Sequence, residues 1–148
     1  MQKIQYNSED IVSHHGIAAI IKNNNAKILM QEHAKYGFWT IPVGKVGKDQ
    51  KVVDGLKQEI LEECNIQIND FTEIMTREYT YNRDGNDVLV ISHLFDILKY
   101  TGEIKNNEPH KHTQQKFLSL DEIKELTYLS DLTLLYLETI GFIRAARI

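Results

Sequence analysis

The chain has 148 residues and is 42% hydrophobic, which is enough for one core and too much for a disordered chain. Its net charge of -4 argues against a nucleic-acid-binding module that works by bulk electrostatics, but not against an anionic ligand, because bound cations reverse the local field. The single Cys64 excludes an internal disulfide. Met1 to Asp10 lacks the apolar core of a signal peptide, and no apolar run approaches the ~20 residues that span a bilayer. We expect one domain, residues 1–148, that acts in the cytoplasm without membrane contact.

The front of the chain predicts strands and a glycine-bearing loop. Residues 16–22 (GIAAIIK) indicate a buried strand, and residues 27–31 (KILMQ) indicate its return strand in a hairpin. The turn between them falls at residues 23–25, because Asn tolerates left-handed backbone. Residues 38–42 (FWTIP) predict a short extended piece, and residues 44–50 (GKVGKDQ) predict a polar loop.

The rest of the chain predicts a mixture of helices and strands. We expect a helix at residues 52–64 that Asn65 ends, longer strands at 71–83 and 87–100, a polar loop at 105–114 and a short strand at 116–118. Ser119 and Glu122 have the spacing of a capping box for a helix from Leu120, and Ser130 and Gly141 bracket a last helix at residues 131–140. This order predicts an α+β or mixed α/β domain, with a sheet between helices.

The helix at residues 52–64 carries the most distinctive pattern. Glu59, Glu62 and Glu63 are spaced at i, i+3 and i+4, so they share one face of the helix. A separate apolar seam, which we expect to pack on the sheet, comprises Val53, Leu56, Ile60 and Cys64. A solvated acidic face is the common interpretation of such a triplet. With no Lys or Arg at i+4, however, the face also suits a hard cation with oxygen ligands.

The sequence around this helix resembles a known motif. It reads Gly44-x5-Gln50-x7-Gln58-Glu59-Ile60-x-Glu62-Glu63-x-Asn65-Ile66. This is similar to the Nudix box, Gly-x5-Glu-x7-Arg-Glu-U-x-Glu-Glu-x-Gly-U, in which U is a bulky aliphatic residue. Residues 38–42 look like the family's Trp-x-Leu-Pro lead-in, and residues 107–122 resemble the tail of MutT-like nucleotide pyrophosphohydrolases.

The resemblance implies a fold, a reaction and a set of functional residues. The fold would be a Nudix-type α/β/α sandwich with a mixed central sheet. The reaction would be hydrolysis of a nucleoside diphosphate linked to another group. Glu59, Glu62 and Glu63 would bind Mg²⁺ or Mn²⁺, with Glu59 and Glu62 catalytic, and Gly44 would let the backbone approach the phosphates. Glu108 matches a loop carboxylate that joins the metals or acts as a base in MutT-like members, although an exposed loop acid beside a proline is the alternative.

Three positions depart from the box. Asn65 replaces Gly, a mild change because Asn also suits a left-handed helix end. Gln50 stands where the family has Glu, and Gln58 where it has Arg. We infer that a charged contact between these positions has become a neutral amide contact, which would orient Glu59 less firmly and could reduce turnover.

Several other residues are weaker candidates. His33 and Lys35 suit phosphate contact, with a solvent-facing loop as the alternative. Trp39 suits stacking on a base, although an aromatic at strand spacing is more often core. His110 and His112 suggest a zinc pair as an alternative, but no thiol lies nearby in the sequence.

The sequence therefore favours metal-dependent hydrolysis of a small nucleotide, with a nucleoside triphosphate as the first choice. Dinucleoside polyphosphate or ADP-ribose hydrolysis comes next. A catalytically weakened domain that binds a nucleotide as a sensor is an alternative of a different class, and the acidic balance disfavours an RNA cap hydrolase. Tyr136 and Phe142 suit either the core or a homodimer surface.

Overall fold

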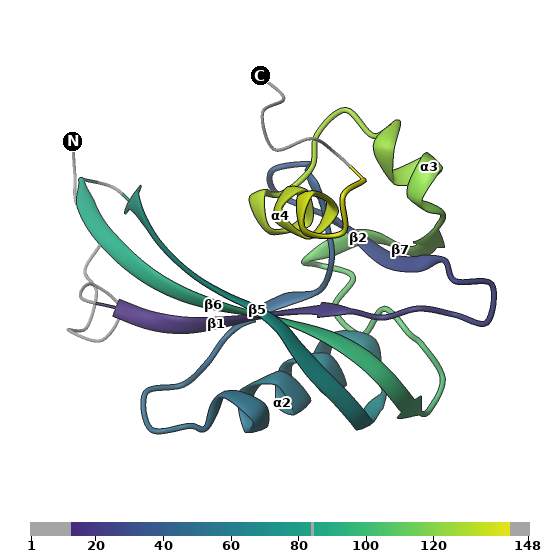
Figure 1. The fold of residues 1–148 in the computed structure, drawn as a ribbon, viewed down its shortest axis with the longest axis horizontal. Helices are drawn as coiled ribbons and strands as arrows, with labels where there is room; N and C mark the ends of the chain where they lie inside the picture. The colour runs from purple at the N-terminus through teal and green to yellow at the C-terminus, as the bar shows by residue number, and fades with distance from the viewer. Residues whose placement is uncertain (1–12, 84, 143–148) are drawn as a thin grey trace.

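The computed structural model describes residues 13–83 and 85–142, so the polar opening segment, Met1 to Asp10, lies outside the described residues (Figure 1). In chain order the elements are β1 (Ser13–Ile20), β2 (Ile28–His33), β3 (Trp39–Thr40), β4 (Val43–Lys45), α2 (Val52–Cys64), β5 (Gln67–Arg83), β6 (Asn86–Thr101), β7 (His112–Leu118), α3 (Leu120–Lys124) and α4 (Asp131–Thr139). The predicted mixture of helices and strands is therefore confirmed.

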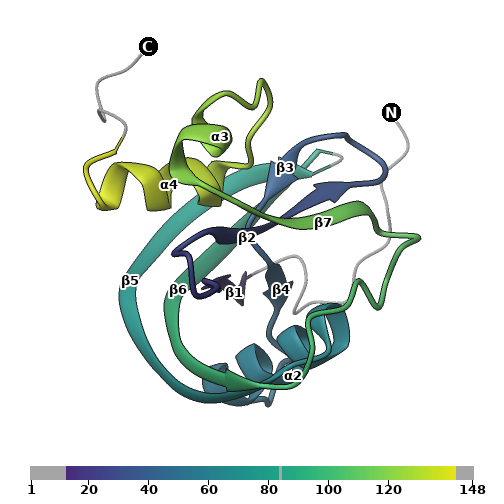
Figure 2. The same cartoon turned by 90° about the vertical axis from the view of Figure 1, so that its right-hand side faces the viewer.

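The strands form two sheets. The larger has the order β4-β1-β6-β5, in which β1 and β6 are parallel and the other pairs are antiparallel. The smaller is antiparallel, with the order β3-β2-β7. Figure 2 shows β5 and β6 as long curved strands, with β2 and β7 lying across the opposite side of the molecule. The larger sheet is mixed, as expected.

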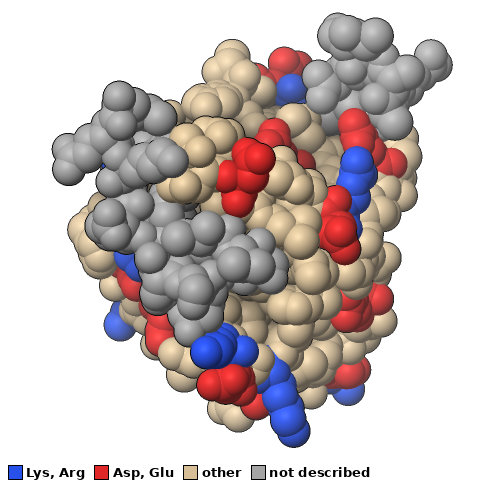
Figure 3. Space-filling view, turned by 90° about the vertical axis from the view of Figure 1, so that its left-hand side faces the viewer, with Lys and Arg blue, Asp and Glu red and all other residues tan. Residues whose placement is uncertain are grey.

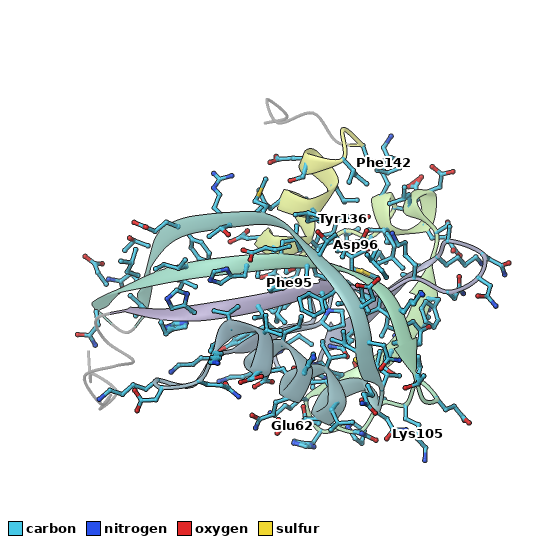
Figure 4. The ribbon with its side chains drawn as sticks, turned by 60° about the horizontal axis from the view of Figure 1, so that its bottom comes forward. Glu62, Phe95, Asp96, Lys105, Tyr136 and Phe142 are labelled. Carbon is cyan, nitrogen blue, oxygen red and sulfur yellow. The ribbon has the colours of Figure 1, made fainter. Side chains whose placement is uncertain are left out.

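Helices cover the larger sheet on both faces, which confirms the α/β/α sandwich (Figure 1). One core cluster joins α2 to one face of this sheet and includes Ile17, Leu56, Ile60 and Phe95. A second cluster joins the opposite face to α3 and α4 and includes Ala18, Leu94, Ile123 and Leu137. Neighbouring strand residues alternate between the two clusters because successive side chains point to opposite faces of a sheet. Figure 4 shows Phe95 between the sheet and α2, and Tyr136 on the other side.

Helix α2 has the predicted bounds. Leu56, Ile60 and Cys64 of the apolar seam are fully buried, whereas Val53 is only half-buried. The helix ends where Asn65 adopts a left-handed conformation, with φ 65°, and donates its backbone N–H to the Leu61 carbonyl. The expected substitution of Asn for Gly at this position is therefore accommodated by the backbone.

The prediction that the first two strands pair as a hairpin is wrong. β1 and β2 belong to different sheets, and only an isolated bridge between Lys22 and Ile28 joins them. The left-handed residue of the connecting turn is Ala26, with φ 61°, and not an Asn. Asn23 acts through its side chain instead, because its Oδ1 accepts from the backbone of Asn25 and Lys27.

Two loop predictions also need correction. Strand β4 takes in residues 44–45 of the expected polar loop, and it pairs with β1 through Ile17 opposite Gly44. Strand β7 begins at His112, so it takes in residues expected in the loop before it. The capping box of Ser119 and Glu122 and the cap at Ser130 are present as predicted. No helix among residues 13–83 and 85–142 is long and apolar enough to cross a membrane.

Candidate active site

The three glutamates of α2 differ sharply in exposure. Glu63 is only 5% exposed, Glu59 is half-buried and Glu62 is exposed. Figure 4 shows Glu62 on the side of α2 that faces away from the sheet. The solvent exposure of the predicted acidic face therefore varies across it, because neighbouring segments cover one edge and leave the other in solvent.

Glu63 lies in a buried polar network. Its Oε1 accepts from Nε2 of Gln31 on β2 at 3.2 Å, and Gln31 is fully buried. Nε2 of Gln31 also lies 3.3 Å from Nε2 of His112. Oε1 of Gln31 accepts a hydrogen bond from Nε2 of Gln115 at 2.9 Å. Burial raises the pKa of Glu63 to about 8, despite the opposing Gln31 hydrogen bond. Burial therefore favours the protonated form of Glu63.

Glu59 lies against the backbone of strand β4. A Cβ on Gly44 would come within 2.4 Å of the Glu59 Cγ and 2.7 Å of its Oε2, so only glycine leaves room for this side chain. Burial first, and the neighbouring Glu62 second, raise the pKa of Glu59. The protonated Glu63 donates a hydrogen bond to Glu59, so these two carboxyl groups meet directly.

Glu62 is held by the two amides that depart from the box. Gln58 donates from Nε2 to Oε2 of Glu62 at 3.0 Å, and Gln50 donates from Nε2 to Oε1 of Gln58 at 2.6 Å. The inferred neutral contact between positions 50 and 58 is therefore present. It orients Glu62, however, and not Glu59 as the sequence argument had it.

The loop between β6 and β7 packs on the C-terminal end of α2. Its backbone N–H groups at Lys105 and Asn107 donate to the carbonyls of Cys64 and Glu63, at 3.0 and 3.3 Å. These carbonyls are among those that a helix leaves without partners at its end. The next residue, Glu108, is thereby placed close enough for its charge to raise the pKa of Glu59 and of Glu63. Its carboxylate pairs with Lys111 at 3.4 Å.

A pocket adjoins this acidic cluster. Its volume is about 330 Å³, and its lining includes Gly44, Lys45, Tyr79, Ser92 and Leu132. Gly44 thus touches the pocket on one side and Glu59 on the other. The Ser92 hydroxyl is buried and has no hydrogen-bond partner among the described residues. A pocket of this size with a spare polar group suits a small organic ligand.

The remaining candidates lie outside this cluster. His33 packs against the rings of Tyr36 and Phe38, and burial lowers its pKa. Lys35 is exposed, with its Nζ 5.1 Å from the centre of the Tyr36 ring. Trp39 is only 8% exposed and packs in the second core cluster, so little of its ring is open to a base. Phosphate or base contact by these residues stays a prediction.

The residues that surround Glu63 were not predicted from the sequence. Gln31, His112 and Gln115 come from β2 and β7, and nothing in the chain order places them beside α2. The available signal was Gln31 itself, a polar residue in the apolar run of the second strand. His112 is buried among these groups, and burial lowers its pKa. The zinc pair of His112 with His110 stays a prediction.

Several known proteins are similar to this chain in sequence or in fold. Among curated relatives, the 8-oxo-dGTP diphosphatase of Buchnera aphidicola subsp. Schizaphis graminum is 28% identical over 77% of this chain and 82% of its own length. The 8-oxo-dGDP phosphatase NUDT18 of Danio rerio is 29% identical over 42% of this chain, which spans only 20% of that relative's length. The crystal structure of a MutT NUDIX hydrolase from Burkholderia pseudomallei has a TM-score of 0.73 at 24% identity, and the match covers 86% of this chain and 98% of that chain.

The family assignment rests on the match over nearly the whole chain. The NUDIX domain family model matches residues 12–135, which include all of α2 and the loop that carries Glu108. The chain therefore belongs to the NUDIX domain family.

Proposed function

We propose that this protein hydrolyses a phosphoanhydride bond of a nucleoside triphosphate, with Mg²⁺ or Mn²⁺ held by the carboxylates of α2. One observation carries the proposal: Glu59 lies against Gly44, which also lines the adjoining pocket, and Glu62, Glu63 and Glu108 lie near enough to Glu59 to affect its pKa. The carboxyl group of Glu59 is therefore next to a residue that lines the cavity, which supports a site for a phosphorylated nucleoside. The family membership supports hydrolysis of a nucleoside diphosphate derivative.

The carboxylates fit a divalent cation by their chemistry. Their oxygens are the ligands that Mg²⁺ and Mn²⁺ prefer, and the raised pKa of Glu63 means that it holds a proton which a bound cation would displace. Among the described residues, no three His, Cys, Asp or Glu side chains are gathered closely enough to hold a metal ion as they stand. The hydrogen bond between Glu63 and Glu59 occupies oxygens that a cation would use, so binding requires these two groups to separate.

Each residue has an assigned role in the reaction. Glu59, Glu62 and Glu63 would hold the cation, which when bound would offset the charge of the phosphate oxygens and lower the pKa of a water molecule. Glu108 takes the proton of the attacking water as a general base, because the α2 carboxylates are engaged. Lys111, which lies beside Glu108, supplies positive charge to the polyphosphate.

The pocket accounts for the organic part of the substrate. We assign Tyr79 to stack on the base and the Ser92 hydroxyl to hydrogen-bond with it, since both line the pocket and the hydroxyl is unpaired among the described residues. The name of the Buchnera relative, an 8-oxo-dGTP diphosphatase, supports a purine deoxynucleoside triphosphate. The chain has 17 Lys and Arg against 21 Asp and Glu, and Figure 3 shows charged side chains of both signs scattered over one face. This acidic balance favours a small nucleotide over a nucleic acid.

A sensor that binds nucleotide without turnover is the second candidate. It is favoured by the Glu59–Glu63 hydrogen bond and by the absence, among the described residues, of an assembled three-ligand group. Intact Glu59, Glu62 and Glu63 oppose it.

A substrate panel separates these candidates. The protein would be incubated with nucleoside triphosphates, 8-oxo-dGTP, a dinucleoside polyphosphate and ADP-ribose, with Mg²⁺, Mn²⁺ or EDTA, and the products identified by ³¹P NMR. We expect metal-dependent release of pyrophosphate or phosphate from a triphosphate, lost in Glu62→Gln and retained in the exposed loop variant Glu103→Gln. Tight nucleotide binding without turnover of any compound would favour the sensor. Turnover of Glu62→Gln at the parental rate would contradict the metal assignment.

A further inference from the structure

A chain of side-chain amides runs from the loop before α2 to Glu62. The Gly47 backbone N–H donates to Oε1 of Gln50 at 2.9 Å, Gln50 donates to Gln58 at 2.6 Å, and Gln58 donates to Glu62 at 3.0 Å. We call Gly47, Gln50 and Gln58 the amide relay. Gln50 does not touch Glu62, yet it is connected to it through Gln58.

The relay has a single direction. A backbone N–H can only donate, so Gly47 fixes the oxygen of the Gln50 amide toward itself and the nitrogen toward Gln58. Gln58 must then present its oxygen to Gln50 and its nitrogen to Glu62. Reversing either amide would place two acceptors against each other. The backbone of the loop therefore decides that a donor faces the Glu62 carboxylate.

The surrounding backbone leaves room for this arrangement. Gln50 also donates its own backbone N–H to the Gly47 carbonyl, at 3.2 Å, which closes the turn. Gly55 in α2 lies beside the relay, and a Cβ there would come within 3.1 Å of Oε1 of Gln50. Glycine at this position lets the Gln50 side chain lie across the helix.

We propose that the amide relay positions Glu62 for metal binding, and that its polarity is set at Gly47. The inference rests on the proposed role of Glu62 as a metal ligand. Glu63 is held by Gln31, and Glu59 is held against Gly44, but Glu62 projects into solvent. A long exposed side chain has many rotamers, and a hydrogen bond that selects one of them makes the ligand ready to bind.

Gln50→Glu tests the direction of the relay. The variant replaces one NH₂ group by an oxygen, so residue 50 can still accept from Gly47 but cannot donate to Gln58. The Gln58 amide must then turn its nitrogen to residue 50 and its oxygen to Glu62, which repels the carboxylate. We expect Mn²⁺ affinity to fall by about tenfold, in the range for loss of a partner that orients a metal ligand. Simple electrostatics predicts the opposite, because an added negative charge near the site attracts a cation.

A rescue and a control complete the design. Gln50→Glu combined with Gln58→Arg should restore affinity, because arginine donates to both carboxylates at once. Asn24→Asp makes the same chemical change in the exposed turn between β1 and β2 and should leave affinity unchanged. Mn²⁺ binding to the full chain would be followed by the electron paramagnetic resonance signal of the free ion. The Gln58 side-chain amide would be followed by ¹⁵N–¹H NMR in the metal-free protein.

The outcomes separate the relay from the proposed function. A shifted Gln58 amide resonance in Gln50→Glu, with weaker Mn²⁺ binding that the second substitution rescues, supports the relay. Unchanged or tighter Mn²⁺ binding by Gln50→Glu, or an equal loss in Asn24→Asp, overturns it. If the parent chain binds no Mn²⁺, the proposed function fails, and the NMR arm still decides the relay, because an unshifted Gln58 amide resonance overturns it.

Discussion

At the scale of single residues, the three glutamates of α2 have different partners although they share one helix face. Glu63 packs against Gln31, Glu59 packs against Gly44, and Glu62 is exposed. Burying a carboxylate without a counter-charge is costly, and burial raises the pKa of Glu59 and of Glu63. In the proposed metal site, a proton and a divalent cation would therefore compete for the oxygens of these two groups.

This competition predicts how stability depends on pH in EDTA. The pKa of Glu63 is about 8 in the folded protein against 4.5 for an ordinary Glu, so only the folded state keeps the proton between these values. The free energy of unfolding therefore falls as the pH rises through this window. The lowered pKa of His112 makes stability rise with pH, but only below 6.5, the ordinary pKa of a histidine. From about pH 6.5 to 8, His112 therefore does not oppose the decline in stability caused by Glu63. Urea unfolding in EDTA at a series of pH values measures this decline.

The matched variant is Glu63→Gln, which cannot release a proton. We expect its stability to change much less between pH 6.5 and 8 than that of the parent chain. A parent chain whose stability rises with pH across this window would show that Glu63 is ionised in the fold.

Gly44→Ala tests the close approach of β4 and Glu59. The added Cβ would come within 2.4 Å of the Glu59 Cγ, so we expect a loss of about 1–3 kcal/mol in unfolding free energy, as for an overpacked site, together with a loss of turnover. Combining Gly44→Ala with Glu59→Ala should remove most of the stability cost of the first change, because the obstructing atoms are gone. Urea denaturation of the four proteins completes the cycle. Additive costs would place Glu59 away from Gly44.

At the scale of elements, the end of α2 and the loop before β7 form one unit. The loop donates hydrogen bonds to the last carbonyls of α2, and this fixes Glu108 near Glu59 and Glu63. Asn107 contributes its side chain as well, because its Nδ2 lies 3.4 Å from the Leu61 carbonyl. The proposed base, Glu108, thus comes from a different segment but is positioned by the same helix that carries the proposed metal ligands.

Glu108→Gln isolates the role of this loop. The change keeps the shape of the side chain but removes its ability to take a proton, so we expect kcat to fall by about 10²–10⁴-fold. Nucleotide affinity should change far less, because the pocket is untouched. Steady-state kinetics measures kcat, and calorimetry with a non-hydrolysable analogue measures nucleotide affinity. An unchanged kcat would make Glu108 a surface residue without a catalytic role.

Local sequence signals predicted the ends of several helices well, but they did not predict which strands pair with one another. The bounds of α2 and the caps of α3 and α4 follow from residues near the helix ends, such as Asn65, Ser119 and Ser130. The sheet that each strand joins depends on distant segments, so nothing local separates β1 from β2. The contact between Gln31 and Glu63 joins residues 32 positions apart for the same reason.

At the scale of the whole molecule, the sandwich gathers the site from its middle layer and both outer layers. Helix α2 supplies carboxylates, β4 supplies Gly44, and β5, β6 and α4 supply the pocket residues Tyr79, Ser92 and Leu132. The box predicted α2 and Gly44 because its spacing lies within one continuous stretch. The pocket could not be predicted in this way, because its lining comes from strands and a helix far apart in the chain.

The central claim is that the α2 carboxylates form a divalent metal site, and Mn²⁺ binding tests it most directly. Free Mn²⁺ would be titrated with the parent chain and with Glu59→Gln, each at pH 7.5 without nucleotide (a pH of about 7.5 keeps histidines neutral). We expect the parent chain to bind Mn²⁺ and Glu59→Gln to bind it at least about tenfold more weakly, since one charged oxygen ligand is lost. Equal binding by the two proteins, or no binding by the parent chain, would contradict the account.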